Sequence, residues 1–155
     1  MRILGAFMSR FLVLTGTTGV PLIERGICRL GRSSHSFLLQ TKNKIDFYEG
    51  TNISHFNFLE MGMINCSEFD GVIGHCGAGT VFWALENKLP LLAVIDLNRP
   101  DDHQSDLGGW LKKYNFALVI ENRVPRLGDL DDLVSRDFQE YTADPFCYEK
   151  IYDLL

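Results

Sequence analysis

The sequence lacks any hydrophobic run long enough to cross a membrane, because no window holds about eighteen consecutive apolar residues. It also lacks a basic run longer than two residues, and its 15 lysines and arginines are outnumbered by 20 acidic residues, for a formal net charge of -5. Binding to nucleic acid through the phosphates needs a clustered cationic surface. We therefore expect no direct membrane span and no nucleic-acid partner.

Cysteine is scarce as well, and the four cysteines present show no CxxC spacing. Disulfide frameworks and zinc sites both need suitably spaced ligands, so we expect reduced thiols in a cytoplasmic protein and no metal site. His75, Cys76 and His103 lack a fourth partner with metal-ligand spacing. The 155 residues, 46% of them hydrophobic, suffice for one ordinary core, so the sequence predicts a single domain over residues 1–155.

Short apolar runs alternate with helical patterns along the chain. Strand-helix-strand alternation predicts an α/β fold with an open, mostly parallel sheet and helices on both faces, Rossmann-like in type. Residues 125–155 are expected to form a C-terminal helical extension. The runs predicted as strands are residues 11–14, 37–39, 71–73, 91–95 and 117–120, and apolar residues at helical spacing follow at 56, 59 and 63, at 81, 84 and 85, and at 107, 110, 111 and 114.

The strongest local signal is residues 70–80, DGVIGHCGAGT, where a strand runs through Gly74, Gly77 and Gly79 into a helix. Missing side chains let a ligand approach the backbone, and free N–H groups at a helix start attract anionic oxygens. The pattern predicts a diphosphate site. It is not a Walker loop, since no Gly-Lys-Thr follows, and the alternative is a turn that only permits close packing.

Two more turns are expected at the same edge of the sheet, because ligands of open α/β sheets bind outside the carboxyl ends of the strands. After residues 91–95, Asp101 or Asp102 would cap a helix whose first turn holds His103 and Gln104, with donors and acceptors suited to sugar hydroxyls. The alternative there is helix capping alone. The turn at residues 15–19 adds further N–H groups and hydroxyls.

The spacing of these turns resembles a known family. The elements that carry the likeness are Gly16-Thr17-Thr18, HCGAGT at 75–80, Lys88-Leu89-Pro90 and Asp102-His103-Gln104. The chain resembles the short, donor-binding subunits of the eukaryotic two-part UDP-N-acetylglucosamine transferases of dolichol-linked oligosaccharide synthesis. More distantly, it is similar to the C-terminal halves of bacterial lipid II synthase and other family 28 glycosyltransferases of GT-B type. The likeness covers about residues 11–122.

The resemblance implies an inverting glycosyltransferase without a cofactor, which transfers N-acetylglucosamine from UDP-GlcNAc to GlcNAc-pyrophosphoryl-dolichol. It implies a membrane-anchored partner subunit that binds the lipid-linked acceptor at the cytosolic face of the endoplasmic reticulum. The implied roles are diphosphate contacts for Gly77, Ala78, Gly79 and Thr80, framing of that loop for His75, sugar contacts for His103 and Gln104, and enclosure of the donor for Gly16, Thr17 and Thr18.

One position departs from the family pattern. Where the family has a glutamate that binds the ribose, this sequence has Trp83, whose indole N–H cannot accept hydrogen bonds as a carboxylate does. Glu86, roughly 60° around the helix, is the remaining candidate for the ribose contact. The alternatives are a non-catalytic or altered sugar-nucleotide-binding module, and a two-part transferase subunit that uses another UDP-sugar in polysaccharide assembly.

The remaining residues are expected to take no part in the chemistry. Cys76 is expected to be a small buried residue rather than a nucleophile. The aromatic and aliphatic residues of the stretch 144–155 predict docking onto this domain or onto the partner. The remaining expectations are surface or satisfied positions for His35 and His55, core positions for Trp110 and Tyr114, and a solvated helix start for Asp129, Asp131 and Asp132.

Overall fold

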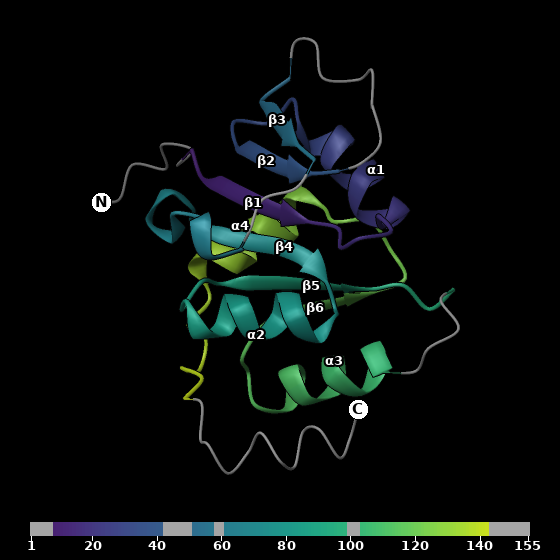
Figure 1. Cartoon of the computed structure of the whole chain (residues 1–155), viewed down its shortest axis with the longest axis vertical. Helices are drawn as coiled ribbons and strands as arrows, with labels where there is room; N and C mark the ends of the chain where they lie inside the picture. Colours follow the sequence, from purple (N-terminus) through teal and green to yellow (C-terminus); the bar gives the residue numbers. More distant parts are fainter. Residues whose placement is uncertain (1–7, 42–50, 58–60, 99–102, 143–155) are drawn as a thin grey trace.

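The computed structural model describes residues 8–41, 51–57, 61–98 and 103–142. These residues form a six-stranded, fully parallel sheet in the order β3-β2-β1-β4-β5-β6, with helices on both faces (Figure 1). The predicted Rossmann-like α/β fold is therefore confirmed. Its elements are β1 (Arg10–Leu14), α1 (Pro21–Leu30), β2 (Ser36–Gln40), β3 (Ile53–Phe56), β4 (Gly71–His75), α2 (Ala78–Glu86), β5 (Leu91–Ile95), α3 (His103–Lys113), β6 (Leu118–Glu121) and α4 (Leu127–Ser135).

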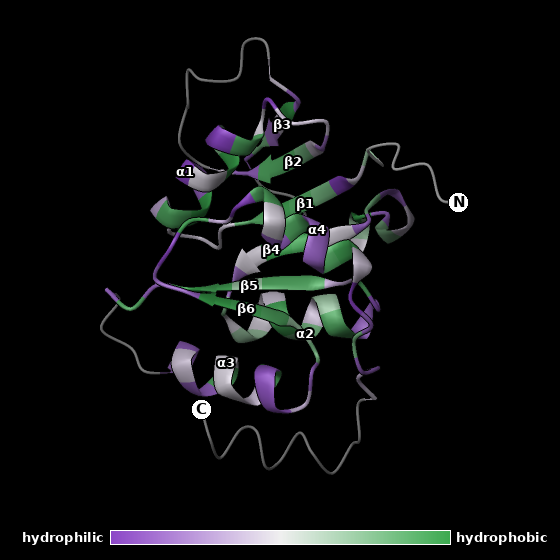
Figure 2. Cartoon of the chain, turned by 180° about the vertical axis from the view of Figure 1, so that it is seen from behind, coloured by the Kyte–Doolittle hydropathy of each residue, from purple (hydrophilic) through white to green (hydrophobic). Residues whose placement is uncertain are grey.

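Two hydrophobic clusters, one on each face of the sheet, hold the layers together. Helices α1 and α4 pack on one face, where Ile23, Ile27, Leu130 and Leu133 are buried against the strands (Figure 2). Helices α2 and α3 pack on the other face. Strand β5 is buried at every position, which explains why it is a continuous apolar run in the sequence rather than an alternating one.

The region after Ser54 differs from its prediction. A helix with apolar residues at 56, 59 and 63 was expected, whereas the structure has strand β3 followed by a 3-10 turn at Met61–Met63. Ile53 is buried and lies opposite Phe37 of β2 in the parallel register. Three apolar residues fit a short helix or a strand equally well, and pairing with the free edge of β2 decides between them.

Helix α1 was not predicted, although its sequence carries the usual signals. Pro21 occupies the start of the helix, where its missing N–H costs no hydrogen bond, and Ile23, Ile27 and Leu30 recur at intervals of four and three residues. All three side chains are buried. The missed helix matters for the site, because it fixes the direction in which the chain leaves β1.

The strand order changes direction at the centre of the sheet, because β2 and β3 are added on one side of β1 and β4, β5 and β6 on the other. Strands β1 and β4 are neighbours, with Leu14 opposite Gly74, but the helices that follow them, α1 and α2, pack on opposite faces. The two connections therefore diverge at the carboxyl ends of β1 and β4. In open α/β folds this switch point is where ligands bind.

The expected helical extension over 125–155 contains helix α4, and the chain then continues without a helix over residues 136–142. Tyr141 packs among Phe82, Trp110 and Phe116, with ring centroids 5.6–6.0 Å from its own. Trp110 thus belongs to the core as predicted. The core prediction for Tyr114 is wrong: its exposed fraction is 47%, because it lies just past the last residue of α3. The stretch 144–155 lies outside the described residues.

Asp129 corrects another expectation, since it is not merely solvated. Both of its carboxylate oxygens accept hydrogen bonds from the Arg123 guanidinium at 2.7 Å, and one accepts the Arg126 N–H at 2.8 Å. The Arg123 contact, aided by that N–H, lowers the pKa of Asp129. The carboxylate therefore joins the β6–α4 turn to the first turn of the helix, a position where negative charge is favourable.

We expect Asp129→Asn to lower the free energy of unfolding by about 1 kcal/mol at pH 7, because the ion pair and the cap are both weakened. A carboxyl group whose pKa falls on folding stabilises the native state above its unfolded pKa of about 3.9, and that contribution is lost as the pH falls through the folded value. The difference from the wild type should therefore shrink below about pH 4. Urea unfolding across pH 2.5–7 measures it, with Asp131→Asn as the matched control; equal losses in both variants would contradict the assignment.

Candidate functional site

Three turns come together at the carboxyl edge of the sheet. They follow β1, β4 and β5, and the parallel register sets Leu14 beside Gly74 and Gly74 beside Ala93. The carboxyl ends of β1, β4 and β5 therefore lie at the same edge of the sheet. The glycine turn at residues 76–80 lies between the other two, at the shared edge of the sheet that the sequence predicted.

The ring of His75 fills the space between the β1 turn and the β4 turn. A Cβ atom on Gly16 would lie 3.1 Å from Cε1 of His75, and a Cβ on Gly77 would collide with the same ring. Gly16 also has a φ of +71°, which side-chain-bearing residues rarely adopt. The Nδ1 atom of His75 is buried. Glycine at both positions thus lets the two turns close around the histidine, which is the arrangement that a framing role requires.

Helix α2 approaches the sheet closely because Gly74 has no side chain. A Cβ atom there would lie 2.7 Å from the Cγ2 methyl of Thr80. Thr80 is buried, so its methyl group packs on β4 and fixes the first turn of the helix. The predicted diphosphate contact of Thr80 would then have to come from its backbone N–H or its hydroxyl, with the methyl group already committed to packing.

The start of α2 is open to a ligand. Gly77 is the N-cap, has an extended backbone (φ -99°, ψ 144°) and provides no side-chain cap, while Ala78 and Gly79 form the first turn. Gly79 is exposed, and a Cβ atom placed on it would meet nothing within 4 Å. The first N–H groups of a helix have no partner inside the helix. This turn can therefore bring backbone donors and the positive end of the helix dipole to an anion.

His103 and Gln104, the two residues after the third turn that are predicted to bind the sugar, differ in their exposure. His103 is exposed at the first residue of α3, whereas Gln104 is only 7% exposed. Oε1 of Gln104 accepts the N–H of Asp96 at 3.5 Å, so this carbonyl serves the turn after β5. Asn98 donates its N–H to Asp96 Oδ1 at 3.0 Å within the same turn. Asp101 and Asp102, the predicted caps of α3, lie outside the described residues.

Trp83, at the position of the family's ribose-binding glutamate, and Glu86, the remaining candidate for the ribose contact, both lie further along helix α2 than the glycine turn. Trp83 is half-buried and packs against the core on the α2 and α3 face. Glu86 is exposed at the last residue of α2, about 12 Å along the helix axis from Ala78. Thr17 and Thr18, by contrast, are exposed in the β1 turn, at the same edge as the glycine turn.

Cys76 follows His75 directly but does not have the properties of a nucleophile. It is 1% exposed, and burial raises the pKa of its thiol to about 12, against a small lowering by Lys112. A reactive cysteine needs its thiolate near neutral pH. The chemistry of this site therefore has to proceed without a covalent cysteine intermediate.

We expect Cys76 to resist iodoacetamide at pH 8 in the native protein and to react only after unfolding. Its thiolate fraction at that pH is on the order of one in ten thousand, against about a quarter for an unperturbed thiol. Cys66 is partly exposed and serves as the internal control. Peptide mass mapping after brief alkylation gives the result, and modification of Cys76 at the rate of Cys66 would overturn the burial argument.

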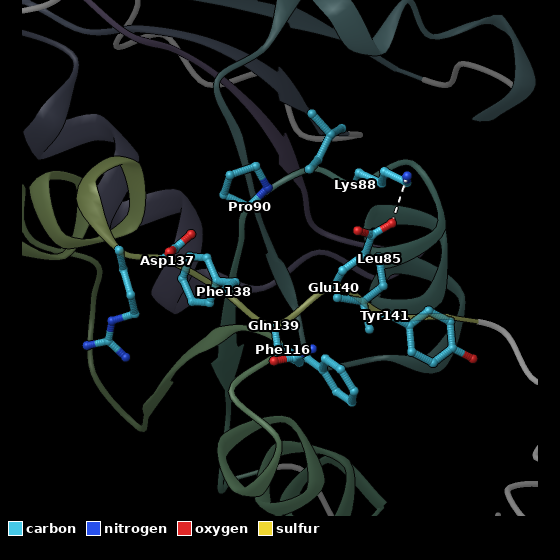
Figure 3. Close-up of a pocket in the computed structure, with 11 residues that line it drawn as sticks. Leu85, Lys88, Pro90, Phe116, Asp137, Phe138, Gln139, Glu140 and Tyr141 are labelled. Carbon is cyan, nitrogen blue, oxygen red and sulfur yellow. Dashed lines mark ion pairs between the residues drawn. The ribbon is translucent and has the colours of Figure 1, made fainter.

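A separate pocket of about 290 Å³ lies at the other end of the sheet, on the amino side of β5 (Figure 3). Pro90 and Phe138 form part of its wall, and the ion pair between Lys88 Nζ and Glu140 Oε1, 2.7 Å long, lies at its rim. The segment 136–141 supplies much of its lining. None of the residues that line this pocket belongs to the three turns, so we place the candidate site at the carboxyl edge.

Among residues 8–41, 51–57, 61–98 and 103–142, no three histidine, cysteine or acidic side chains gather in a way that could hold a metal ion. Within the same residues, none of the helices combines the length and the apolar character needed to cross a membrane.

No protein-family model matches the sequence, and no curated protein matches it either. Solved structures do match, glycosyltransferases among them, and what they share with this chain is the fold. The glycosyltransferase SnogD from Streptomyces nogalater is 18% identical over 84% of this chain, with a TM-score of 0.59. The chain spans just over a third of SnogD, namely 36%.

Two other solved structures share the fold of this chain. The solution structure of ALG13 is 14% identical, with a TM-score of 0.59, and the match covers 93% of this chain and 94% of that one. MurG from Acinetobacter baumannii is 18% identical over 76% of this chain and 38% of its own, with a TM-score of 0.56. At these identities the likeness establishes a shared fold.

Proposed function

We propose that this chain is the donor-binding subunit of a glycosyltransferase that uses a UDP-sugar. The observation that carries the proposal is the closure of the Gly16 turn and the glycine turn around His75 at the switch point of the sheet, with open space at Gly79. A nucleotide diphosphate fits this edge, because it offers backbone N–H groups and a helix start to an anion. The likeness to glycosyltransferase structures supports the same class.

The proposed chemistry is a single displacement with inversion at the anomeric carbon. An acceptor oxygen forms the new bond to that carbon as the bond to the UDP oxygen breaks, and the leaving diphosphate takes the electron pair. The N–H groups at the start of α2 stabilise the charge that develops on the diphosphate. His103 and Gln104 would hold the sugar hydroxyls, so this chain contributes mainly by positioning the donor.

The donor and acceptor proposed are UDP-GlcNAc and GlcNAc-pyrophosphoryl-dolichol, with the family resemblance as the support. A membrane-anchored partner subunit would bind the acceptor and supply the base, at the cytosolic face of the endoplasmic reticulum.

Calorimetry on the isolated chain with UDP, UDP-GlcNAc and ADP tests donor binding. We expect UDP-GlcNAc and UDP to bind and ADP to bind more weakly. Absence of binding by UDP and UDP-GlcNAc at millimolar concentration would overturn the proposal. A competition series with other UDP-sugars separates the dolichol pathway from a transferase of polysaccharide assembly.

A second candidate function is a non-catalytic sugar-nucleotide-binding module. The half-buried Trp83 favours it, because this residue stands where a ribose-binding carboxylate is expected, and Glu86 lies far along the helix. An assay of sugar transfer to a lipid-linked acceptor, with the partner present, separates the two functions. Binding of UDP-GlcNAc without turnover would favour the second.

A further inference from the structure

Three arginines form a row along the outer side of helix α1. Arg25 and Arg29 lie one turn apart, and Arg32 follows just beyond the end of the helix, so the row is roughly 10 Å long. All three are exposed. Because α1 begins directly after the turn at residues 16–19, the row starts beside the carboxyl edge of the sheet and runs away from it (Figure 1).

Within the described residues, these three arginines lack the carboxylate partners that several other cations have. Ion pairs join Arg10, Lys88, Lys112, Arg123 and Arg136 to carboxylates. Within the described part of the chain, no ion pair joins Arg25, Arg29 or Arg32 to an acidic side chain. Arg25 instead donates a hydrogen bond from its Nε to the carbonyl oxygen of Pro21 at 3.4 Å.

The described surroundings of the row include a further cation, Arg126, and the carboxylate of Glu24. A Cβ on Gly26 would lie 2.5 Å from Cδ of Pro125, so α1 touches the β6–α4 turn on this flank. Arg126, next to Pro125, is exposed. Glu24 is the acidic residue of α1, and its carboxylate accepts a hydrogen bond from Thr41 at the end of β2. A local cationic surface thus stands on a chain whose formal net charge is -5.

We propose that this arginine row binds the anionic phospholipid surface of a membrane. An exposed helix face presents its charged side chains outward, which suits a diffuse layer of headgroups better than a compact ligand. Basic residues near an anionic leaflet each strengthen binding about fivefold, and the attraction falls off within a Debye length. The row would hold the carboxyl edge of the sheet beside the membrane. It requires neither UDP binding nor catalysis, so it goes beyond the proposed function.

Co-sedimentation of the full chain with vesicles tests the proposal. We expect binding to vesicles of 70% phosphatidylcholine and 30% phosphatidylserine at 50 mM NaCl, and little binding to pure phosphatidylcholine. The double variant Arg25→Gln with Arg29→Gln should weaken the partition coefficient about 25-fold. The matched control removes two cations from α3 on the other face of the sheet, Lys112→Gln with Lys113→Gln, and should change it less than twofold.

Three further measurements make the result decisive. Arg25→Lys with Arg29→Lys keeps the charge and should keep the binding. Circular dichroism melting checks that each variant is folded, and UDP calorimetry on the glutamine variant should give the wild-type affinity, which separates this proposal from the proposed function. Equal binding to both vesicle types, no binding to either, or equal losses in the α1 and α3 variants would overturn it. The proposal would also be overturned if the wild type bound polyglutamate but not vesicles and the α1 variant lost that binding, because the row would then bind an acidic protein.

Discussion

Replacing Gly79 by aspartate should weaken UDP binding about a hundredfold while the fold stays intact. The new carboxylate would stand in the first turn of α2, where the diphosphate is proposed to bind. Two unit charges about 5 Å apart, at an effective dielectric constant near 20, repel each other by about 3 kcal/mol. Because a Cβ at this position meets nothing within 4 Å, the protein itself accommodates the side chain.

The native state should tolerate or even favour this change. Glycine is a poor helix former, and an acidic residue in the first turn interacts well with the helix dipole. We therefore expect the melting temperature of Gly79→Asp to equal or exceed that of the wild type. A loss of UDP affinity cannot then be attributed to unfolding.

The chain offers an unusually close control at Gly128. This glycine is the second residue of α4, as Gly79 is of α2, it is exposed, and a Cβ there also meets nothing within 4 Å. Gly128→Asp adds the same charge to a helix start on the opposite face of the sheet from α2, and should leave UDP affinity unchanged. Gly79→Asn separates charge from size. Equal UDP affinities for Gly79→Asp, Gly128→Asp and the wild type would place the nucleotide elsewhere.

Replacing Gly74 by alanine should lower the free energy of unfolding by about 1–3 kcal/mol, the usual cost of extra volume in a packed core. The added Cβ would lie 2.7 Å from Cγ2 of Thr80 and 3.5 Å from the carbonyl oxygen of Leu14. For a chain of this size, each kcal/mol lowers the melting temperature by about 2–4 °C. Denaturant unfolding monitored by circular dichroism measures the loss.

The same contact predicts its own rescue. Thr80→Ser removes the Cγ2 methyl and keeps the hydroxyl, so alanine at position 74 should cost much less in that background. Comparing the four proteins in a double-mutant cycle isolates the coupling between the two positions. A cost for Gly74→Ala that is the same beside Thr80 and beside serine would show that the close approach of α2 to β4 is not what requires the glycine.

Local pattern predicted much of the fold. Residues 11–14, 71–73 and 91–95 lie within observed strands, because buried parallel strands need continuous apolar runs that are visible in the sequence. The apolar residues Val81, Ala84 and Leu85 are buried on one side of α2 as their spacing predicted. The prediction was wrong at β3, whose short apolar pattern was taken as helical. Helix α1 was not predicted, although Pro21 and the spacing of its buried residues indicate a helix.

The sequence by itself determined the class of fold, the glycine turn and its place after a strand, since each depends on neighbouring residues. The tertiary structure decided which turns meet. It placed the ring of His75 between Gly16 and Gly77, committed Oε1 of Gln104 to Asp96, and left Glu86 at the far end of α2. It also showed that Asp129 is paired and that the arginines of α1 are not joined to carboxylates within the described residues. Such facts depend on contacts between residues far apart in the chain, and no local pattern encodes them.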